Sequence, residues 1–359
     1  MSRTWAERAL AGVLERVGTT AEEVGPRFPL YADPGTGRWT TTGRGSWAGG
    51  FWAGLLWLRA LASGDRTDVA AARRSTLRLA CWVDQDTATR GMIFWYGTAL
   101  ADATADGLRD RAAHACLGAF DPVLGVVPWG GAFGGPRRLA RADGVPGTVP
   151  LLARVGEAGL AAARSHLTLH LGLCLGEEPP RPAWAALPGG GWRGCDEPAP
   201  GWSRTAAWLL LGAADGMSVP AIGRCGELPA AVRRLTALRL VGSAPLVPPA
   251  GGPGGPGGPG DTSAAAIEAV AALKLAARAR AAGAAADADR LAARAELVLR
   301  RLCAHHLSEP GGPRPAGMLL GGCYDAERGL ATRHELVWGD FFLAVGLAIL
   351  TGLIGPFAA

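Results

Sequence analysis

The sequence has 359 residues, of which 49% are hydrophobic and 19% charged, so one large domain or two ordinary ones would fit. The formal net charge of +5 comes almost entirely from arginine, with Lys274 as the only lysine. Because the arginines are scattered through every segment and form no basic stripe, we expect no nucleic-acid partner. Alanine, leucine and glycine outnumber tyrosine and the β-branched residues, which favours an all-helical (all-α) fold.

The seven cysteines lie far apart and form no Cys-X-X-Cys motif. The N-terminal segment Met1 to Arg16 is predicted to be an amphipathic, charged helix and not a secretory signal. We therefore expect reduced, mostly buried cysteines and a cytoplasmic protein. Cys303, His305 and His306 lie close together, but a single cluster of this kind is more often the polar end of a helix, so we expect no metal and no cofactor.

The first strongly apolar segment, Ser46 to Leu58, contains three tryptophans and no charged residue. Trp47 begins a row of apolar residues at three- and four-residue spacing, and Trp52 widens the apolar surface, so we predict a helix that is buried nearly all round. Gly50 and Gly54 lie four residues apart, where another helix or a ligand can approach closely. The aromatic rings at the start of this helix either fill the core or offer faces on which a sugar ring can stack.

Helical periodicity continues along the chain and predicts further helices at 68–83, 92–103, 108–120, 149–155, 160–175, 202–214, 228–240, 264–281 (capped by 261–263), 285–305 and 337–353. No alternating pattern is long enough to build a sheet. Short turns and long glycine-rich loops alternate between the helices, which indicates a ring of helical hairpins whose long loops gather around a pocket at one rim. The Gly-Gly-Pro repeat within 244–260 is predicted to be a disordered loop inside a single domain that spans 1–359.

The last nineteen residues, Phe341 to Ala359, carry no charge and are within the length range of a transmembrane helix. The Gly355-Pro356 pair interrupts this segment early, and a shorter apolar segment is more often a buried core helix. We therefore predict an inner helix at 341–353 and no membrane partner.

Four blocks of sequence carry a family likeness when they are read in chain order. They are 27–58, which includes Trp-Ala-Gly-Gly-Phe-Trp; 201–208, Gly-Trp-Ser-Arg-Thr-Ala-Ala-Trp; 261–267, Asp-Thr-Ser-Ala-Ala-Ala-Ile; and 322–340, with Gly-Cys-Tyr-Asp and Glu-Leu-Val-Trp-Gly-Asp. Together they resemble the unsaturated glucuronyl and rhamnogalacturonyl hydrolases. The resemblance implies an (α/α)6 barrel, a toroid of six helical hairpins. It also implies hydration of the terminal 4,5-unsaturated uronic acid of oligosaccharides that polysaccharide lyases produce, with an aspartic acid that transfers the proton.

The sequence departs from the family pattern at one of the two aspartates that the chemistry uses. Where the family has a His-Asp pair, this chain has Ala88 and Thr89, and a threonine cannot act as acid or base in that role. The second family aspartate matches Asp143 if one residue is inserted. We predict that Asp143 is the catalytic acid and base; the alternative is an ordinary turn aspartate in Asp-Gly-Val-Pro-Gly.

The predicted substrate-binding residues are five tryptophans and one arginine: Trp47, Trp52, Trp129, Trp202, Arg204 and Trp208. Arg204 either binds a uronate or is a buried arginine paired with an acid such as Asp340. Asp196 and Glu197 form the other carboxylate pair expected at the rim and are by default solvated loop charges.

Three hypotheses of function follow, each with an oligosaccharide or small sugar as partner. The leading one is a hydrolase of the resembling family, possibly with an altered substrate. The second is a degenerate member that binds a sugar without turning it over. The third is a sugar epimerase of another (α/α)6 class, which would need histidines at the mouth of the barrel.

Overall fold

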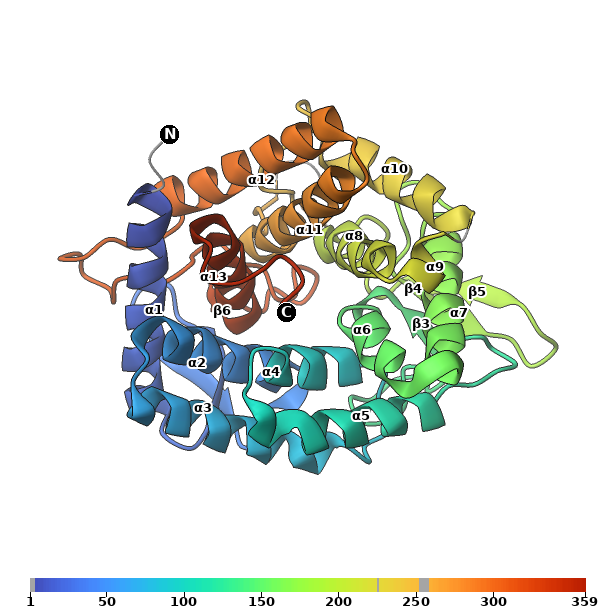
Figure 1. Ribbon diagram of the computed structural model, residues 1–359, viewed down its shortest axis with the longest axis horizontal. Coiled ribbons are helices and arrows are strands. Elements are labelled where there is room, and N and C mark those ends of the chain that lie inside the picture. The colour runs from blue at the N-terminus through green and yellow to red at the C-terminus, as the bar shows by residue number, and fades with distance from the viewer. Residues whose placement is uncertain (1–3, 225, 252–257) are drawn as a thin grey trace.

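Two concentric rings of helices surround a common axis in the computed structural model, which describes residues 4–224, 226–251 and 258–359 (Figure 1). The inner ring consists of α2 (Gly49–Ser63), a π-helical turn (Gly91–Trp95) that continues into α4 (Tyr96–Thr98), α6 (Thr148–Leu152), α8 (Ser203–Ser218), α11 (Thr262–Ala281) and α13 (Val337–Thr351). The outer ring consists of α1 (Thr4–Val24), α3 (Arg66–Arg78), α5 (Asp106–Gly118), α7 (Gly156–Cys174), α10 (Glu227–Arg239) and α12 (Ala285–His305), and the short α9 (Pro220–Gly223) lies between α8 and α10 in the chain. Outer and inner helices alternate along the chain, so the predicted (α/α)6 barrel is confirmed.

The inner helices are the apolar ones, as the sequence predicted. Every residue of α2 from Gly49 to Leu58 is buried, and so is every residue of α13 from Val337 to Ala348. Helix α13 packs against α1, α2 and α11 as a protein-buried element of the inner ring. Among the described residues, no helix combines the length and the hydropathy that crossing a membrane requires.

Two glycines of α2 allow neighbouring elements to approach its backbone. A Cβ atom on Gly50 would lie 2.2 Å from the carbonyl oxygen of Met92, and one on Gly54 would lie 2.4 Å from a ring atom of Phe341. Both distances are shorter than any real carbon contact, so only glycine fits at these positions. The predicted close approach is therefore confirmed, and the approaching groups are the π-helical turn and α13.

The outer helices bury one face only, which explains their amphipathic sequences. Helix α12 buries a stripe that includes Leu291, Val298 and Leu302, and its ends coincide with the predicted 285–305. The predicted cap of α11 is also present, because the Asp261 side chain accepts a hydrogen bond from the backbone N–H of Ser263.

Two small antiparallel sheets contradict the expectation that no sheet forms. One has the order β2 (Trp39–Thr42), β1 (Phe28–Ala32), β6 (Glu335–Leu336), and the other has the order β3 (Leu139–Arg141), β4 (Ala183–Ala186), β5 (Trp192–Gly194). Their strands have two to five residues, which is too short for an alternating pattern to be recognised. Strand β3 of the second sheet ends at Arg141, directly before the turn that carries Asp143.

The loop at 244–260, which the sequence predicts to be disordered, is hydrogen-bonded at both of its described ends. Pro249 pairs with Gly260 in an antiparallel bridge, and the backbone N–H of Ala250 donates to the carbonyl oxygen of Pro259 over 2.8 Å. The backbone N–H of Ser203 donates to the carbonyl of Ala250, which ties this loop to the start of α8. The rest of the predicted disordered loop, 252–257, lies outside the described residues.

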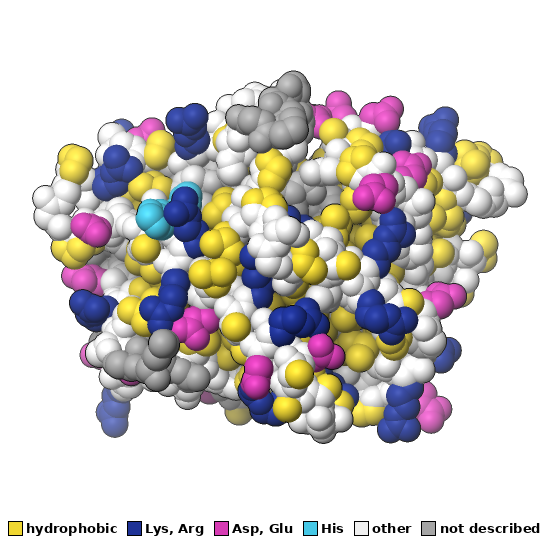
Figure 2. Space-filling model, turned by 90° about the horizontal axis from the view of Figure 1, so that it is seen from above, with side chains coloured by type: hydrophobic (Ala, Val, Ile, Leu, Met, Phe, Trp, Pro, Cys, Tyr) yellow, Lys and Arg dark blue, Asp and Glu magenta, His cyan; other side chains and the backbone are white. Residues whose placement is uncertain are grey.

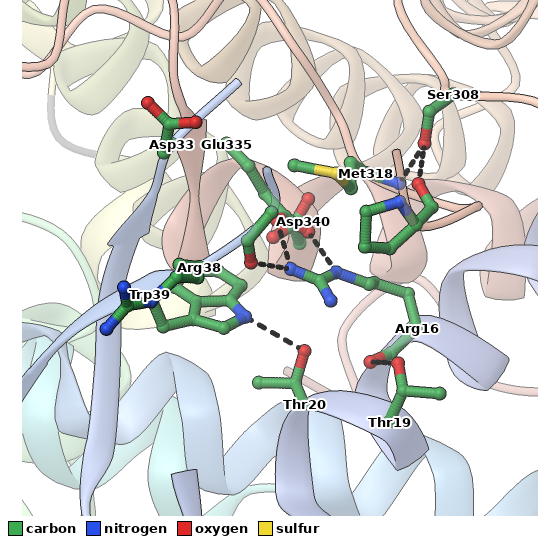
Figure 3. Close-up of polar contacts among 12 residues, drawn as sticks. Arg16, Thr19, Thr20, Asp33, Arg38, Trp39, Ser308, Met318, Glu335 and Asp340 are labelled. Carbon is green, nitrogen blue, oxygen red and sulfur yellow. Dashed lines mark hydrogen bonds and ion pairs between the residues drawn. The ribbon is translucent and has the colours of Figure 1, made fainter. Parts of the chain in front are cut away.

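The first and last hairpins meet at a buried ion pair between α1 and β6, the short strand directly before α13 (Figure 3). Arg16 donates to both carboxylate oxygens of Glu335, over 2.8 and 3.1 Å, and to the carbonyl of Gly37. Asp340 lies beside them and accepts from the backbone N–H of Leu319. Burial, together with the nearby charge of Glu335, raises the pKa of Asp340 well above its ordinary value.

Arginine and acidic side chains are interspersed over the face of the molecule in Figure 2, and neither sign forms a stripe there. The only lysine, Lys274, is buried and donates to Asp215 over 2.6 Å, so the Lys and Arg side chains on the described surface are all arginines. The six described cysteines are free thiols, of which Cys116, Cys174 and Cys323 are buried and Cys81 is exposed.

Candidate functional site

A cavity of about 350 Å³ opens at one rim of the barrel. Loops gather around it, as the sequence predicted, together with the first turns of inner helices. The lining residues are Ser46, Trp47, Thr89, Met92, Trp129, Phe133, Arg141, Asp143, Glu197, Pro198, Ala199, Trp202, Arg204, Trp208, Gly251 and the segment 324–328. Five of the six predicted substrate-binding residues and the predicted catalytic residue therefore line one cavity.

Aromatic rings form much of the cavity wall. Trp47 stacks on Tyr324 with ring centres 6.1 Å apart, and it also contacts Trp338 at 4.8 Å. Trp208, at the floor, lies parallel to Phe51. Such rings present the apolar faces on which sugars stack.

Asp143 lies in the 3-10 turn Ala142–Gly144 that follows β3, and it is held by its neighbour Arg141. Arg141 donates to both carboxylate oxygens, from Nε over 3.2 Å and from Nη2 over 3.1 Å. The Arg141 guanidinium also lies over the Trp129 ring, 4.3 Å from its centre. Its Nη1 group has no hydrogen-bond partner within the described residues, so this unit offers a carboxylate and free N–H groups beside an aromatic ring.

Thr89 lies in the same cavity wall, where the resemblance would place a second acid. Its hydroxyl is hydrogen-bonded to that of Thr87 over 2.8 Å, and both side chains are buried. This position therefore holds two neutral hydroxyls, neither of which exchanges a proton as a carboxyl group does.

Arg204 is a buried arginine, the second of its two predicted interpretations, but its acid is Asp261 and not Asp340. It donates to Asp261 over 2.8 Å and to the carbonyl oxygens of Cys323 and Tyr324. Its guanidinium lies 4.5 Å from the centre of the Trp202 ring. Arg204 thus reaches the cavity mainly by holding the segment that carries Tyr324.

Trp52 is the one predicted substrate-binding residue that the structure does not bring to the cavity. It is buried, and it lies beside a separate small void whose walls include Arg16, Trp39 and Glu335. Five residues separate it from Trp47, which turns the side chain by about 140° around a helix axis. Trp52 therefore belongs to the core on the other side of α2.

Several residues at the cavity mouth were not singled out by the sequence analysis. Arg328 bridges Glu197, over 3.2 Å, and Asp325, over 3.6 Å. Glu327 accepts from the backbone N–H of Ala199 over 2.9 Å and so links the two loops of the mouth. The Gly-Cys-Tyr-Asp block was the available signal for this segment.

Of the other predicted alternatives, Glu197 lines the cavity, whereas Asp196 and the histidines do not. Asp196 is almost fully exposed and pairs with Arg181 over 2.9 Å. His305 ends α12, and no group of three or more potential metal ligands occurs among the described residues. No histidine is among the described residues that line the cavity, which removes the feature that an epimerase would need.

Comparisons with known proteins show which solved structures share this fold. No protein-family model and no curated protein matches the sequence. Among solved structures, the unsaturated glucuronyl hydrolase from Bacillus sp. GL1, described as responsible for the degradation of glycosaminoglycan, is similar with a TM-score of 0.82, 21% identity and coverage of 96% of both chains. The chain has the fold of the unsaturated glucuronyl hydrolases.

Two further structures agree. An unsaturated glucuronyl hydrolase specific for heparin has a TM-score of 0.82 at 17% identity and covers 98% of this chain and 99% of its own. A UGL mutant with the oligosaccharide dGlcA-Glc-Rha-Glc has a TM-score of 0.82 at 21% identity, with 96% of both chains covered. The likeness that four short blocks of sequence indicated is therefore confirmed at the level of the fold.

Proposed function

We propose that the chain is a carbohydrate hydrolase of the unsaturated glucuronyl hydrolase type, which hydrates the terminal 4,5-unsaturated uronic acid of a short oligosaccharide. The observation that carries this proposal is the unit of Asp143, Arg141 and Trp129 in the wall of the rim cavity. The volume of the cavity, about 350 Å³, is near the lower end of the range for small-ligand sites, about 300–1,000 Å³. The fold neighbours are supporting evidence, because one of them carries an oligosaccharide with a dGlcA residue.

Asp143 performs both proton transfers in the proposed reaction. Its carboxyl proton goes to C4 of the double bond, and the resulting carboxylate takes a proton from the water whose oxygen bonds to C5. The net change is the addition of one water, after which the hemiketal opens and releases the next sugar. The two N–H groups of Arg141 stabilise the carboxylate that exists between these transfers.

The substrate carboxylate is proposed to bind the same arginine. Asp143 occupies only two nitrogens of Arg141, and a guanidinium has five N–H donors. The free Nη1 group can therefore receive the uronate within the same cavity. Arg141 thus takes the uronate-binding role predicted for Arg204, which contributes by holding Tyr324 in place.

One observation favours a second candidate, a sugar-binding protein that lacks turnover. The hydroxyl pair of Thr87 and Thr89 stands where the resembling family uses an acid. A site with one carboxylate still binds the sugar through its aromatic walls and Arg141.

Replacing Asp143 by asparagine separates these candidates. Asparagine keeps the shape of the side chain but has no proton to exchange, so turnover of an unsaturated uronyl disaccharide should fall by about 10²–10⁴-fold while binding is retained. Turnover is followed by the loss of absorbance of the conjugated double bond, and binding by calorimetry.

Asp68→Asn is the matched control, because Asp68 pairs with Arg59 over 2.9 Å at similar exposure but lies outside the cavity. It should retain full activity. Wild-type protein that binds the disaccharide without consuming it would establish the sugar-binding candidate. Full activity in Asp143→Asn would exclude Asp143 and direct attention to Glu197 and Asp325.

A further inference from the structure

Two fully buried histidines, His166 and His170, lie on outer helix α7 behind the wall that carries Asp143. The proposed reaction does not use them, and they do not reach the cavity. Their rings contact each other, with centres 4.3 Å apart.

Both ring nitrogens of His166 are hydrogen-bonded to backbone. The N–H of Val127 donates to Nδ1 over 3.1 Å, and Nε2 donates to the carbonyl oxygen of Gly144 over 3.1 Å. Because Nδ1 accepts, the single ring proton is on Nε2.

These two bonds join the segments that form the candidate catalytic wall. Val127 lies two residues before Trp129, and Gly144 directly follows Asp143. The same carbonyl of Gly144 also accepts from the Thr148 hydroxyl over 2.8 Å, which fixes the turn to α6. His166 therefore links, on the side away from the cavity, the segment that carries Trp129 to the turn that carries Asp143.

His170 supports this bridge. Its Nδ1 donates to the carbonyl oxygen of His166 over 2.7 Å. Burial lowers the pKa of His170 to about 4, although its hydrogen bond to His166 and the charge of Asp143 act in the opposite direction. Burial also lowers the pKa of His166 well below its ordinary value, so both rings are neutral near pH 7 and His166 keeps the one tautomer that makes both bonds.

We propose that His166 is a positioning residue that fixes Asp143 relative to Trp129, with His170 holding the His166 ring in place. This inference rests on the proposed role of Asp143. It predicts that the identity of the side chain at 166 affects the proton-transfer step more than it affects the folding of α7.

The test compares His166→Gln, His166→Asn and His166→Leu in the full chain. Glutamine places an amide N–H near the position of Nε2 and keeps the bond to Gly144, whereas asparagine places an acceptor near Nδ1 and keeps only the bond to Val127. Leucine keeps neither. We expect kcat to fall by about 10²-fold in His166→Leu, because a displacement of about 1 Å at a reacting group has an effect of that size. KM should stay within about twofold, kcat of His166→Asn should also fall, and His166→Gln should recover most of it.

Leu167→Ala is the matched control. Leu167 is the next residue of α7, is equally buried and packs toward Gly212 and Gly216 of α8. Its truncation lowers the melting temperature without touching the bridge, so kcat should be unchanged. Loss of kcat in Leu167→Ala to the same extent as in His166→Leu, or equal kcat in all three variants of His166, would overturn the proposal.

A crystal structure of His166→Leu tests the inference independently of turnover. We expect the Asp143 carboxylate to move by about 1 Å or more relative to the Trp129 ring. An unchanged arrangement would overturn the positioning role even if the enzyme is active. If wild-type protein has no activity, the proposed function fails, whereas the positioning role is still decided by this structure.

Discussion

At the scale of single residues, the main difference between this site and the family that it resembles is Thr89, which stands where that family has an aspartate. The structure places it in the wall of the rim cavity, where it bonds to Thr87. The sequence alone predicted the replacement, because Ala-Thr stands where a His-Asp pair was expected. It did not predict Arg141, since nothing in a sequence with scattered arginines shows which of them folds back on Asp143.

Restoring the acid provides a residue-scale prediction. In the present structure the hydroxyl oxygens of Thr87 and Thr89 are 2.8 Å apart. In Thr89→Asp, the Thr87 hydroxyl can therefore donate a hydrogen bond to the new carboxylate. A second acid or base should raise kcat on the unsaturated disaccharide by about 10²-fold, the lower part of the range for such groups.

Thr89→Asn is the isosteric control for this variant and should show no gain. Identical kcat values for the two variants would mean that position 89 has no part in proton transfer.

At the scale of elements, the helices were predictable and the connections between them were not. Periodicity located α12 to the residue, because a one-faced helix repeats its apolar positions over five turns or more. The predicted helix at 92–103 ends at Thr98 and begins with a π-helical turn. The carbonyl groups of that turn pack against Gly50. This contact joins segments that are far apart in the sequence, so a local sequence pattern cannot predict it.

Gly50→Ala is the prediction for this contact. The added methyl group would meet the carbonyl oxygens of Met92 and Ile93 at 2.2 and 2.4 Å, so α2 and the π-helical turn must separate. Because Met92 lines the cavity, we expect both a lower melting temperature and weaker sugar binding.

The control is Gly172→Ala in the exposed face of α7, where no atom lies within 4 Å of the added methyl group. It should stabilise the protein by about 1 kcal/mol, the difference in helix propensity. Thermal unfolding and calorimetry measure both variants, and an unperturbed Gly50→Ala would show that the two elements can move apart freely.

At the scale of the whole molecule, the barrel closes where α1 meets α13. The closure is made by Arg16, Glu335 and the buried Asp340 (Figure 3). The sequence predicted the ring of hairpins, and it named Asp340 as one possible partner of a buried Arg204, because a sequence does not show which acid lies beside a given arginine. The structure separates them, with Asp261 serving Arg204 instead.

Asp340→Asn tests the closure through its dependence on pH. The pKa of Asp340 is raised above its ordinary 3.8, so the folded protein holds this proton more tightly than the unfolded chain does. The resulting stability is complete below 3.8 and is lost as the pH rises through the folded pKa. Asparagine mimics the protonated form, so the melting temperature of the variant relative to wild type should increase as the pH rises above about 4.

Asp289→Asn, an exposed acid paired with Arg280, should show no such trend. A difference between Asp340→Asn and wild type that is constant with pH would mean that Asp340 titrates alike in both states.

Because α1 packs against α13, no hairpin has a free flank within the part of the chain that the structure describes. In an open solenoid, the terminal repeats lose one neighbour each and unfolding can unzip from the ends. A closed ring gives every hairpin two neighbours, so local opening anywhere must break two interfaces at once. The free energies of opening measured by amide hydrogen exchange should therefore be similar in all the inner helices. Amides of the α1–α2 hairpin should exchange as slowly as those of the α10–α11 hairpin.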